Sequence, residues 1–97
     1  MALHKLRATD VRSISDPGLH GDGGGLYLKV TDAGTRSWVY RFQINGKRRG
    51  MGLGSAGVIG LAQARQIAQR CREQVAQGID PIDARTAETR AVTALTR

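Results

Sequence analysis

The dipeptide Asn45-Gly46 constrains the fold of this chain more than any other feature of its sequence. A two-residue type I′ turn needs positive φ at both central positions, and Asn followed by Gly adopts that conformation at little cost. From Ser37 to Ile44 apolar and polar residues alternate, which is typical of a strand with one buried face. We therefore predict an antiparallel hairpin with strands over residues 37–44 and 47–53.

The turn also fixes which residues lie opposite each other, because a two-residue loop sets the register of its hairpin. On the apolar face the expected pairs are Ile44 with Lys47, Phe42 with Arg49, Tyr40 with Met51, and Trp38 with Leu53. On the opposite face they are Gln43 with Arg48, Arg41 with Gly50, and Val39 with Gly52. The four apolar side chains of residues 38–44 are therefore expected to form a core rather than a surface for stacking nucleic-acid bases.

A third strand is predicted over residues 26–30, where Leu26, Leu28 and Val30 alternate with polar residues. Matching its apolar side chains to the same core places Tyr27 beside Arg41 and Lys29 beside Val39. The polar face of the sheet then consists of Tyr27, Lys29, Arg41, Gln43 and Arg48, with Gly50 and Gly52 along its edge.

Helical spacing replaces the strand pattern after residue 60. Apolar or small residues recur along one stripe, at Leu61, Ala64, Ala68, Cys71 and Val75. This pattern predicts an amphipathic helix that ends near Gly78 and covers the apolar face of the sheet. The expected fold is α+β, with a three-stranded antiparallel sheet, and room for a short extra edge strand, packed on one C-terminal α-helix. A short helical turn is also expected over residues 8–14.

The 97 residues suffice for one small domain, which we expect to span residues 1–79. Asp80-Pro81 has the composition of an N-cap followed by the first helical position. The Ala- and Thr-rich segment after it lacks a clear apolar stripe. We therefore interpret residues 80–97 as a helical or disordered linker toward a downstream domain that is not in this chain.

Positive charge is concentrated in the middle of the chain, whose formal net charge is +7. Between residues 25 and 54 a single acid, Asp32, stands against Lys29, Arg36, Arg41, Lys47, Arg48 and Arg49. Such an excess indicates a polyanionic partner, with nucleic acid the first candidate and an acidic membrane surface the second. A solubilising surface would mix both signs.

Other kinds of chemistry find little support in the sequence. Residues 52–57 match GxGxxG, but the strand before them belongs to a hairpin and no strand follows the helix, so a dinucleotide site is not expected. His4 and His20 lie in segments with no nucleophile or carboxylate arranged around them, and Cys71 lies on the apolar stripe. No metal-ligand spacing occurs, and the longest apolar run, GVIGLA, is too short to cross a bilayer. We expect a soluble intracellular protein without catalysis, cofactor or metal.

A β-ribbon fits the major groove of DNA, where Arg can bond guanine and Gln can bond adenine. Candidates for reading bases are Arg41, Gln43 and Arg48. Candidates for the DNA backbone are Tyr27, Lys29, Arg36, Lys47 and Arg49. Gly50 and Gly52 permit close approach to DNA, although a flexible or bulged edge strand explains them equally well.

Six sequence elements also resemble a known family in order and spacing. They are DGGGLYLKV (22–30), the lone Trp38, Asn45-Gly46-Lys47, MGLGS (51–55), LAQAR (61–65) and GIDP (78–81). Together, over residues 3–85, they resemble the N-terminal arm-type DNA-binding domain of phage and genomic-island integrases of the tyrosine recombinase family. Two positions depart from the family pattern, Gly60 where many relatives have Ser and Gln43 where many have Arg.

The resemblance implies a three-stranded sheet against one helix, with the sheet in the major groove of arm-type DNA repeats. It implies double-stranded DNA and other integrase protomers as partners, no membrane or small-molecule substrate, and a location in the bacterial cytoplasm or nucleoid. The family's catalytic residues lie in a later domain and none maps onto this chain, so it is expected to bind DNA without cutting it. A free-standing regulator, an RNA-binding module and a protein-interaction module remain as alternatives.

Overall fold

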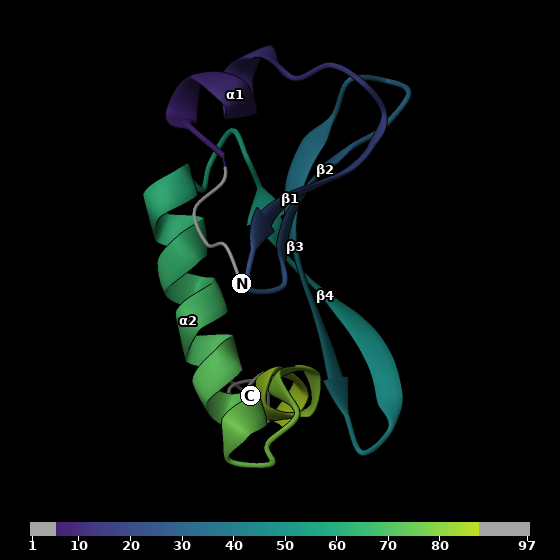
Figure 1. The fold of residues 1–97 in the computed structure, drawn as a ribbon, viewed down its shortest axis with the longest axis vertical. Coiled ribbons are helices and arrows are strands. Elements are labelled where there is room, and N and C mark those ends of the chain that lie inside the picture. The colour runs from purple at the N-terminus through teal and green to yellow at the C-terminus, as the bar shows by residue number, and fades with distance from the viewer. Residues whose placement is uncertain (1–5, 88–97) are drawn as a thin grey trace, which may run out of the picture.

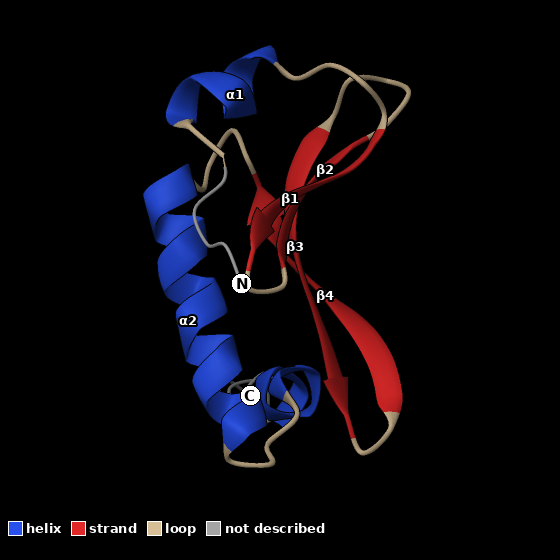
Figure 2. Ribbon diagram, viewed as in Figure 1, coloured by secondary structure: helices blue, strands red, loops and turns tan. Residues whose placement is uncertain are grey.

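The computed structural model describes residues 6–87 and consists of a sheet with one long helix along one face (Figure 1). The elements are α1 (Ala8–Ser13), β1 (Gly18–Gly23), β2 (Leu26–Val30), β3 (Arg36–Ile44), β4 (Lys47–Ser55) and α2 (Leu61–Ala76). A further helical segment begins at Pro81 and is described to residue 87. The strands are all antiparallel and lie in the order β1-β2-β3-β4 (Figure 2).

The β3–β4 hairpin forms as the Asn-Gly turn predicts. Asn45 and Gly46 have φ values of 52° and 75°, and the register agrees with prediction from Ile44–Lys47 to Val39–Gly52. The last predicted pair is wrong, because Trp38 lies opposite Gly54 instead of Leu53. Leu53 is the extra residue of a β-bulge. Gly54 allows this irregularity with a φ of 137°, in a region that favours glycine.

The predicted pairing of the 26–30 strand with β3 is wrong by two residues. Tyr27 pairs with Val39, and Lys29 pairs with Ser37. The register is set by the β2–β3 turn, in which the Thr31 N–H donates to the Thr35 carbonyl over 3.0 Å. Because the shift is an even number of residues, every side chain stays on its predicted face.

The sheet has four strands rather than three, and β1 is the short extra edge strand for which the prediction left room. Glycine occupies three of its six positions, so it lacks the alternation that reveals a strand. The turn into β2 has positive φ at Gly23, Gly24 and Gly25. A Cβ at Gly25 would lie 2.5 Å from the Arg41 carbonyl oxygen, which explains why the motif requires glycine there. The expected helical turn is confirmed as α1, so α2 is not the sole helix.

The core lies between the sheet and α2, as predicted. Trp38, Tyr40, Phe42 and Ile44 are buried, and Trp38 has no exposed surface. The small residues Ala64, Ala68 and Cys71 form the buried stripe of α2. Burial raises the pKa of the Cys71 thiol, as expected for a core cysteine. The Trp38 indole N–H donates to the Ile59 carbonyl over 2.7 Å, so the ring also fixes the loop before α2.

Two arginines of α2 bind the end of β1 and the glycine-rich turn that follows it. Arg65 donates from Nε and Nη2 to the two carboxylate oxygens of buried Asp22, each over 2.9 Å. These hydrogen bonds raise the pKa of the Arg65 guanidinium. Arg72, two helical turns later, donates to the Gly24 carbonyl over 3.0 Å. The DGGG and LAQAR motifs therefore contact each other in the fold, through Asp22 of the first and Arg65 of the second.

The segment after α2 packs against the hairpin. The Asp80 carboxylate accepts the Ile82 N–H over 2.9 Å, which confirms the predicted N-cap. Pro81 is buried, and Arg85 donates to the Gly52 carbonyl over 2.6 Å. Residues 88–97 of the predicted linker lie outside the described residues. The division at residues 79 and 80 stays a prediction.

Within residues 6–87 no helix is both long and apolar enough to span a membrane. The same residues contain no cluster of three or more His, Cys, Asp or Glu side chains suited to a metal ion.

Candidate nucleic-acid interface

Alternation along the four strands directs one set of side chains away from α2, onto what we call the outer face. Its residues are Leu19, Gly21, Tyr27, Lys29, Val39, Arg41, Gln43, Arg48, Gly50 and Gly52. The predicted polar residues and both glycines are thus on one surface. Leu19 and Gly21 join them from β1.

Arg41 occupies the centre of the outer face. Its guanidinium carbon lies 5.9 Å from the centroid of the Tyr27 ring, which is within cation–π range. The same ring covers Gly21, where a Cβ would lie 3.4 Å from Tyr27 Cε2. Tyr27 therefore orients Arg41 through its ring face. Because this contact uses no N–H group, the donors of the guanidinium stay available for a ligand.

The three predicted base-reading residues lie together. A hollow of ≈ 270 Å³ is lined by Tyr27, Arg41, Phe42, Gln43, Arg48 and Arg49. Arg41, Gln43 and Arg48 are all exposed, and Gln43 pairs across the strands with Arg48. The two arginines and the amide are the side-chain types that form bidentate contacts with guanine and adenine.

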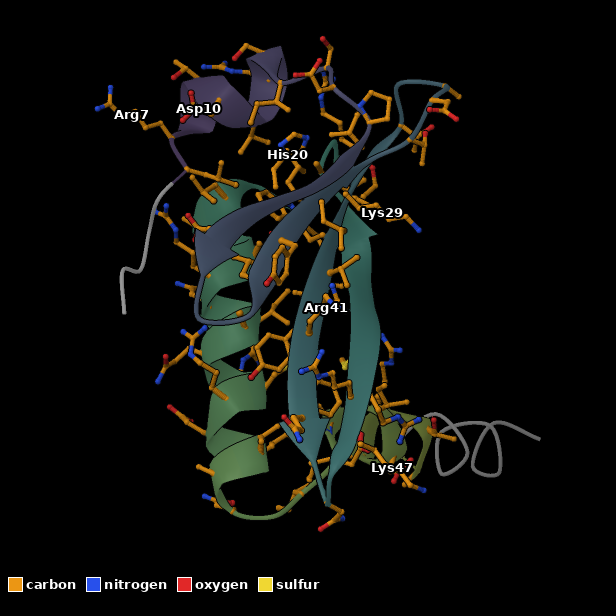
Figure 3. All side chains as sticks on the ribbon, turned by 45° about the vertical axis from the view of Figure 1, so that its right-hand side comes forward. Arg7, Asp10, His20, Lys29, Arg41 and Lys47 are labelled. Carbon is orange, nitrogen blue, oxygen red and sulfur yellow. The ribbon has the colours of Figure 1, made fainter. Side chains whose placement is uncertain are left out.

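Four cations of the hairpin region are accessible. Lys29, Arg41, Lys47 and Arg48 are exposed, and within residues 6–87 they form no ion pair. Figure 3 shows Lys29, Arg41 and Lys47 spread along the length of the sheet, with Lys47 near the end of the hairpin. Their spacing along one elongated surface suits a linear polyanion.

Arg36 and Arg49, also predicted to contact the DNA backbone, have partners within the protein. Arg36 Nε donates to the Ile14 carbonyl over 2.9 Å and so ties β3 to the end of α1. Arg49 Nη1 lies 2.6 Å from Asp80 Oδ2 and 3.4 Å from Asp83 Oδ1. Both arginines alternate onto the side of the sheet that faces α2, so the structure separates them from the outer face.

The Arg49–Asp80 contact also shifts the pKa values of both side chains. The hydrogen bond that Arg49 donates to the Asp80 carboxylate raises the pKa of Arg49. Burial acts to raise the pKa of Asp80, but hydrogen bonds from the Ile82 N–H and from Arg49 outweigh it and lower that pKa. Asp80 is therefore charged near neutral pH and competes with any phosphate for Arg49.

The two glycines of the outer face are not required by packing within the domain. A Cβ at Gly50 would meet Val39 Cγ1 at 3.7 Å and Arg41 Cγ at 3.9 Å, which are ordinary contacts. A Cβ at Gly52 would have no heavy atom within 4 Å. Gly52 borders the β-bulge, whereas Gly50 lies in the regular ladder. The bulge interpretation therefore applies to Gly52, whereas for Gly50, on the edge strand β4, a flexible edge and close approach of DNA remain as explanations.

The pattern of a family described as an arm DNA-binding domain matches residues 5–88, which is most of the chain. The chain belongs to this arm DNA-binding domain family.

Relatives of the arm domain are integrases of phages and prophages. The chain is 37% identical over 68 residues to the integrase of Shigella phage Sf6 and, equally, to prophage integrase IntS of Escherichia coli strain K12. It is 39% identical over 62 residues to the integrase of Enterobacteria phage P4. These matches cover 70%, 70% and 62% of the chain but only 18%, 18% and 14% of the relatives.

One outer-face residue of the arm domain escaped the sequence analysis. Leu19 lies on β1 and has 43% of its surface exposed. An isolated leucine in a glycine-rich segment carries no periodicity, so no sequence signal marked it.

Proposed function

We propose that this arm domain binds double-stranded DNA with its outer face in the major groove, as the arm-site module of a tyrosine recombinase integrase. The cluster of Arg41, Gln43 and Arg48 on an exposed antiparallel sheet carries the proposal. A major groove about 12 Å wide admits a β-ribbon, and these three side chains reach base edges from it.

The remaining cations and Tyr27 position the domain on the DNA backbone. Lys29 and Lys47 contact phosphates near opposite ends of the hairpin, and the Tyr27 hydroxyl is a further donor. Arg36 and Arg49 take this role only by exchanging their present partners. The chain binds without cutting, and recombinase chemistry belongs to a downstream domain. Its partners are arm-type repeats and other integrase protomers in the bacterial cytoplasm or nucleoid, with no membrane, small molecule, cofactor or metal.

Salt dependence of binding to short duplexes tests this function. With about four phosphates neutralised, log K is expected to fall against log salt with a slope near −4. Fluorescence anisotropy with labelled duplexes at several salt concentrations measures the slope. A slope near zero, or equal affinity for a neutral control polymer, rejects DNA as the ligand and favours a protein partner.

Paired substitutions distinguish base contacts from phosphate contacts. Arg41→Ala is expected to weaken binding to a preferred duplex by about 1–3 kcal/mol and to reduce the preference for it. Lys47→Ala is expected to weaken all duplexes similarly and to flatten the salt slope by about one. Anisotropy titrations with preferred and scrambled duplexes measure both effects. Identical behaviour of the two variants contradicts the assigned roles.

A further inference from the structure

The outer face has a second hollow, beside the polar one, with a different lining. Its volume is ≈ 290 Å³. The lining residues are Gly18, Leu19, Lys29, Val30, Val39, Arg41 and Gly50. Arg41 lines both hollows, so the polar one and this one adjoin across a single side chain.

The walls of this second hollow are mainly apolar. Leu19, with 43% of its surface exposed, and half-buried Val39 are the aliphatic side chains of an outer face whose other members are basic, polar or aromatic side chains and glycines. The volume is far above the roughly 10–15 Å³ of such space that one water molecule needs, so there is room for a methyl group. Solvent-exposed apolar surface between cations is expected where an apolar group of a charged ligand docks.

We propose that this hollow receives the C5-methyl group of a thymine, so that the domain reads at least one A·T base pair by apolar contact. The inference rests on the proposed major-groove binding. Among the four bases, only thymine presents a methyl group in that groove. Lys29 and Arg41 flank the hollow, and no acidic side chain of the described residues lines it, which matches a polyanion that carries the methyl group.

Gly50 supports this assignment. Its position lies in the regular ladder, and packing within the protein would tolerate a Cβ there. A side chain at residue 50 would instead project beside Val39 and Arg41, into the space of the hollow. The glycine is therefore explained by a ligand that approaches this part of the sheet closely.

Uracil substitution in DNA tests the proposal, because deoxyuridine lacks only the methyl group. Duplexes that bind the 97-residue chain are first selected from a randomised pool, and each thymine of a selected site is then replaced singly by deoxyuridine. Replacement at one or two positions is expected to weaken binding about fourfold, which corresponds to about 0.8 kcal/mol for one buried methyl group.

Protein variants assign the effect to the hollow. Val39→Thr keeps the size but adds a hydroxyl, and it is expected to reduce the thymine-to-uracil ratio to about one. Gly50→Ala is expected to keep the thermal midpoint and to lose most of the same ratio. The matched control is Val58→Thr on the loop before α2, where the residue is 83% exposed; this variant should keep the fourfold ratio.

The possible outcomes separate the two proposals. If selected duplexes bind but every uracil substitution is neutral, the thymine assignment is wrong and DNA binding stands. If the ratio survives in Val39→Thr and Gly50→Ala, the methyl group is read elsewhere and the assignment is again wrong. If no duplex is enriched or bound, the proposed function itself fails.

Discussion

Replacing Trp38 by alanine is expected to lower the free energy of unfolding by about 3–5 kcal/mol. The ring has no exposed surface, and its N–H donates to the Ile59 carbonyl over 2.7 Å, so the variant loses core volume and a hydrogen bond together. Native proteins have only about 5–15 kcal/mol in total, and small domains lie toward the lower end of that range. The variant should therefore populate the unfolded state appreciably at room temperature.

Urea denaturation followed by far-UV circular dichroism measures this loss, since the variant lacks the sole tryptophan for fluorescence. Val58→Ala is the matched control, because Val58 is 83% exposed and surface substitutions usually change stability by less than about 0.5 kcal/mol. A Trp38→Ala midpoint equal to that of the wild type would contradict the burial of this ring.

Local signals made the hairpin predictable. Asn45-Gly46 favours one turn type, and a two-residue loop fixes which residues of the two strands lie opposite each other. Six of the seven predicted hairpin pairs are observed, and the seventh fails at the bulge at Leu53. The bulge could not be predicted from the alternation of apolar and polar residues. Leu53 is apolar and packs against the core, as a regularly paired residue would at that position.

Features that depend on distant partners were not predictable. Strand β1 is recognisable only by its pairing with β2, because glycine supplies three of its six residues. Asp22 and Arg65 are 43 residues apart, and a single acid or arginine in a sequence does not name its partner. The role of the two short motifs that contain Asp22 and Arg65 is therefore visible only in the folded structure, where these side chains are hydrogen-bonded.

The sequence predicted which side chains share the outer face, but not which cations have partners in distant elements. Alternation places Arg41, Gln43 and Arg48 on one face, and the structure groups them there. The pairing of Arg36 with Ile14 and of Arg49 with Asp80 depends on elements that fold back from other parts of the chain. The distribution of charge along the sequence therefore did not show which cations already have partners within the protein.

Replacing Arg65 by methionine is also expected to cost about 3–5 kcal/mol of stability. The Asp22 side chain is 2% exposed, so removing the guanidinium leaves a carboxylate in a desolvated site without its two strong hydrogen bonds from Arg65. Arg65 also donates to the Leu6 carbonyl over 2.7 Å, and that contact is lost too. Urea denaturation of the variant measures the cost, with Arg70→Met, an exposed arginine of the same helix, as the control.

Arg65→Lys shows whether charge or geometry matters more at this contact. An ammonium group keeps the positive charge but cannot make two parallel bonds to one carboxylate, so the lysine variant should recover only part of the loss. Equal stability of the lysine variant and the wild type would show that the positive charge alone, and not the two parallel hydrogen bonds, stabilises this contact. A methionine variant as stable as Arg70→Met would contradict the burial of Asp22 itself, because a desolvated carboxylate deprived of this partner must destabilise the fold.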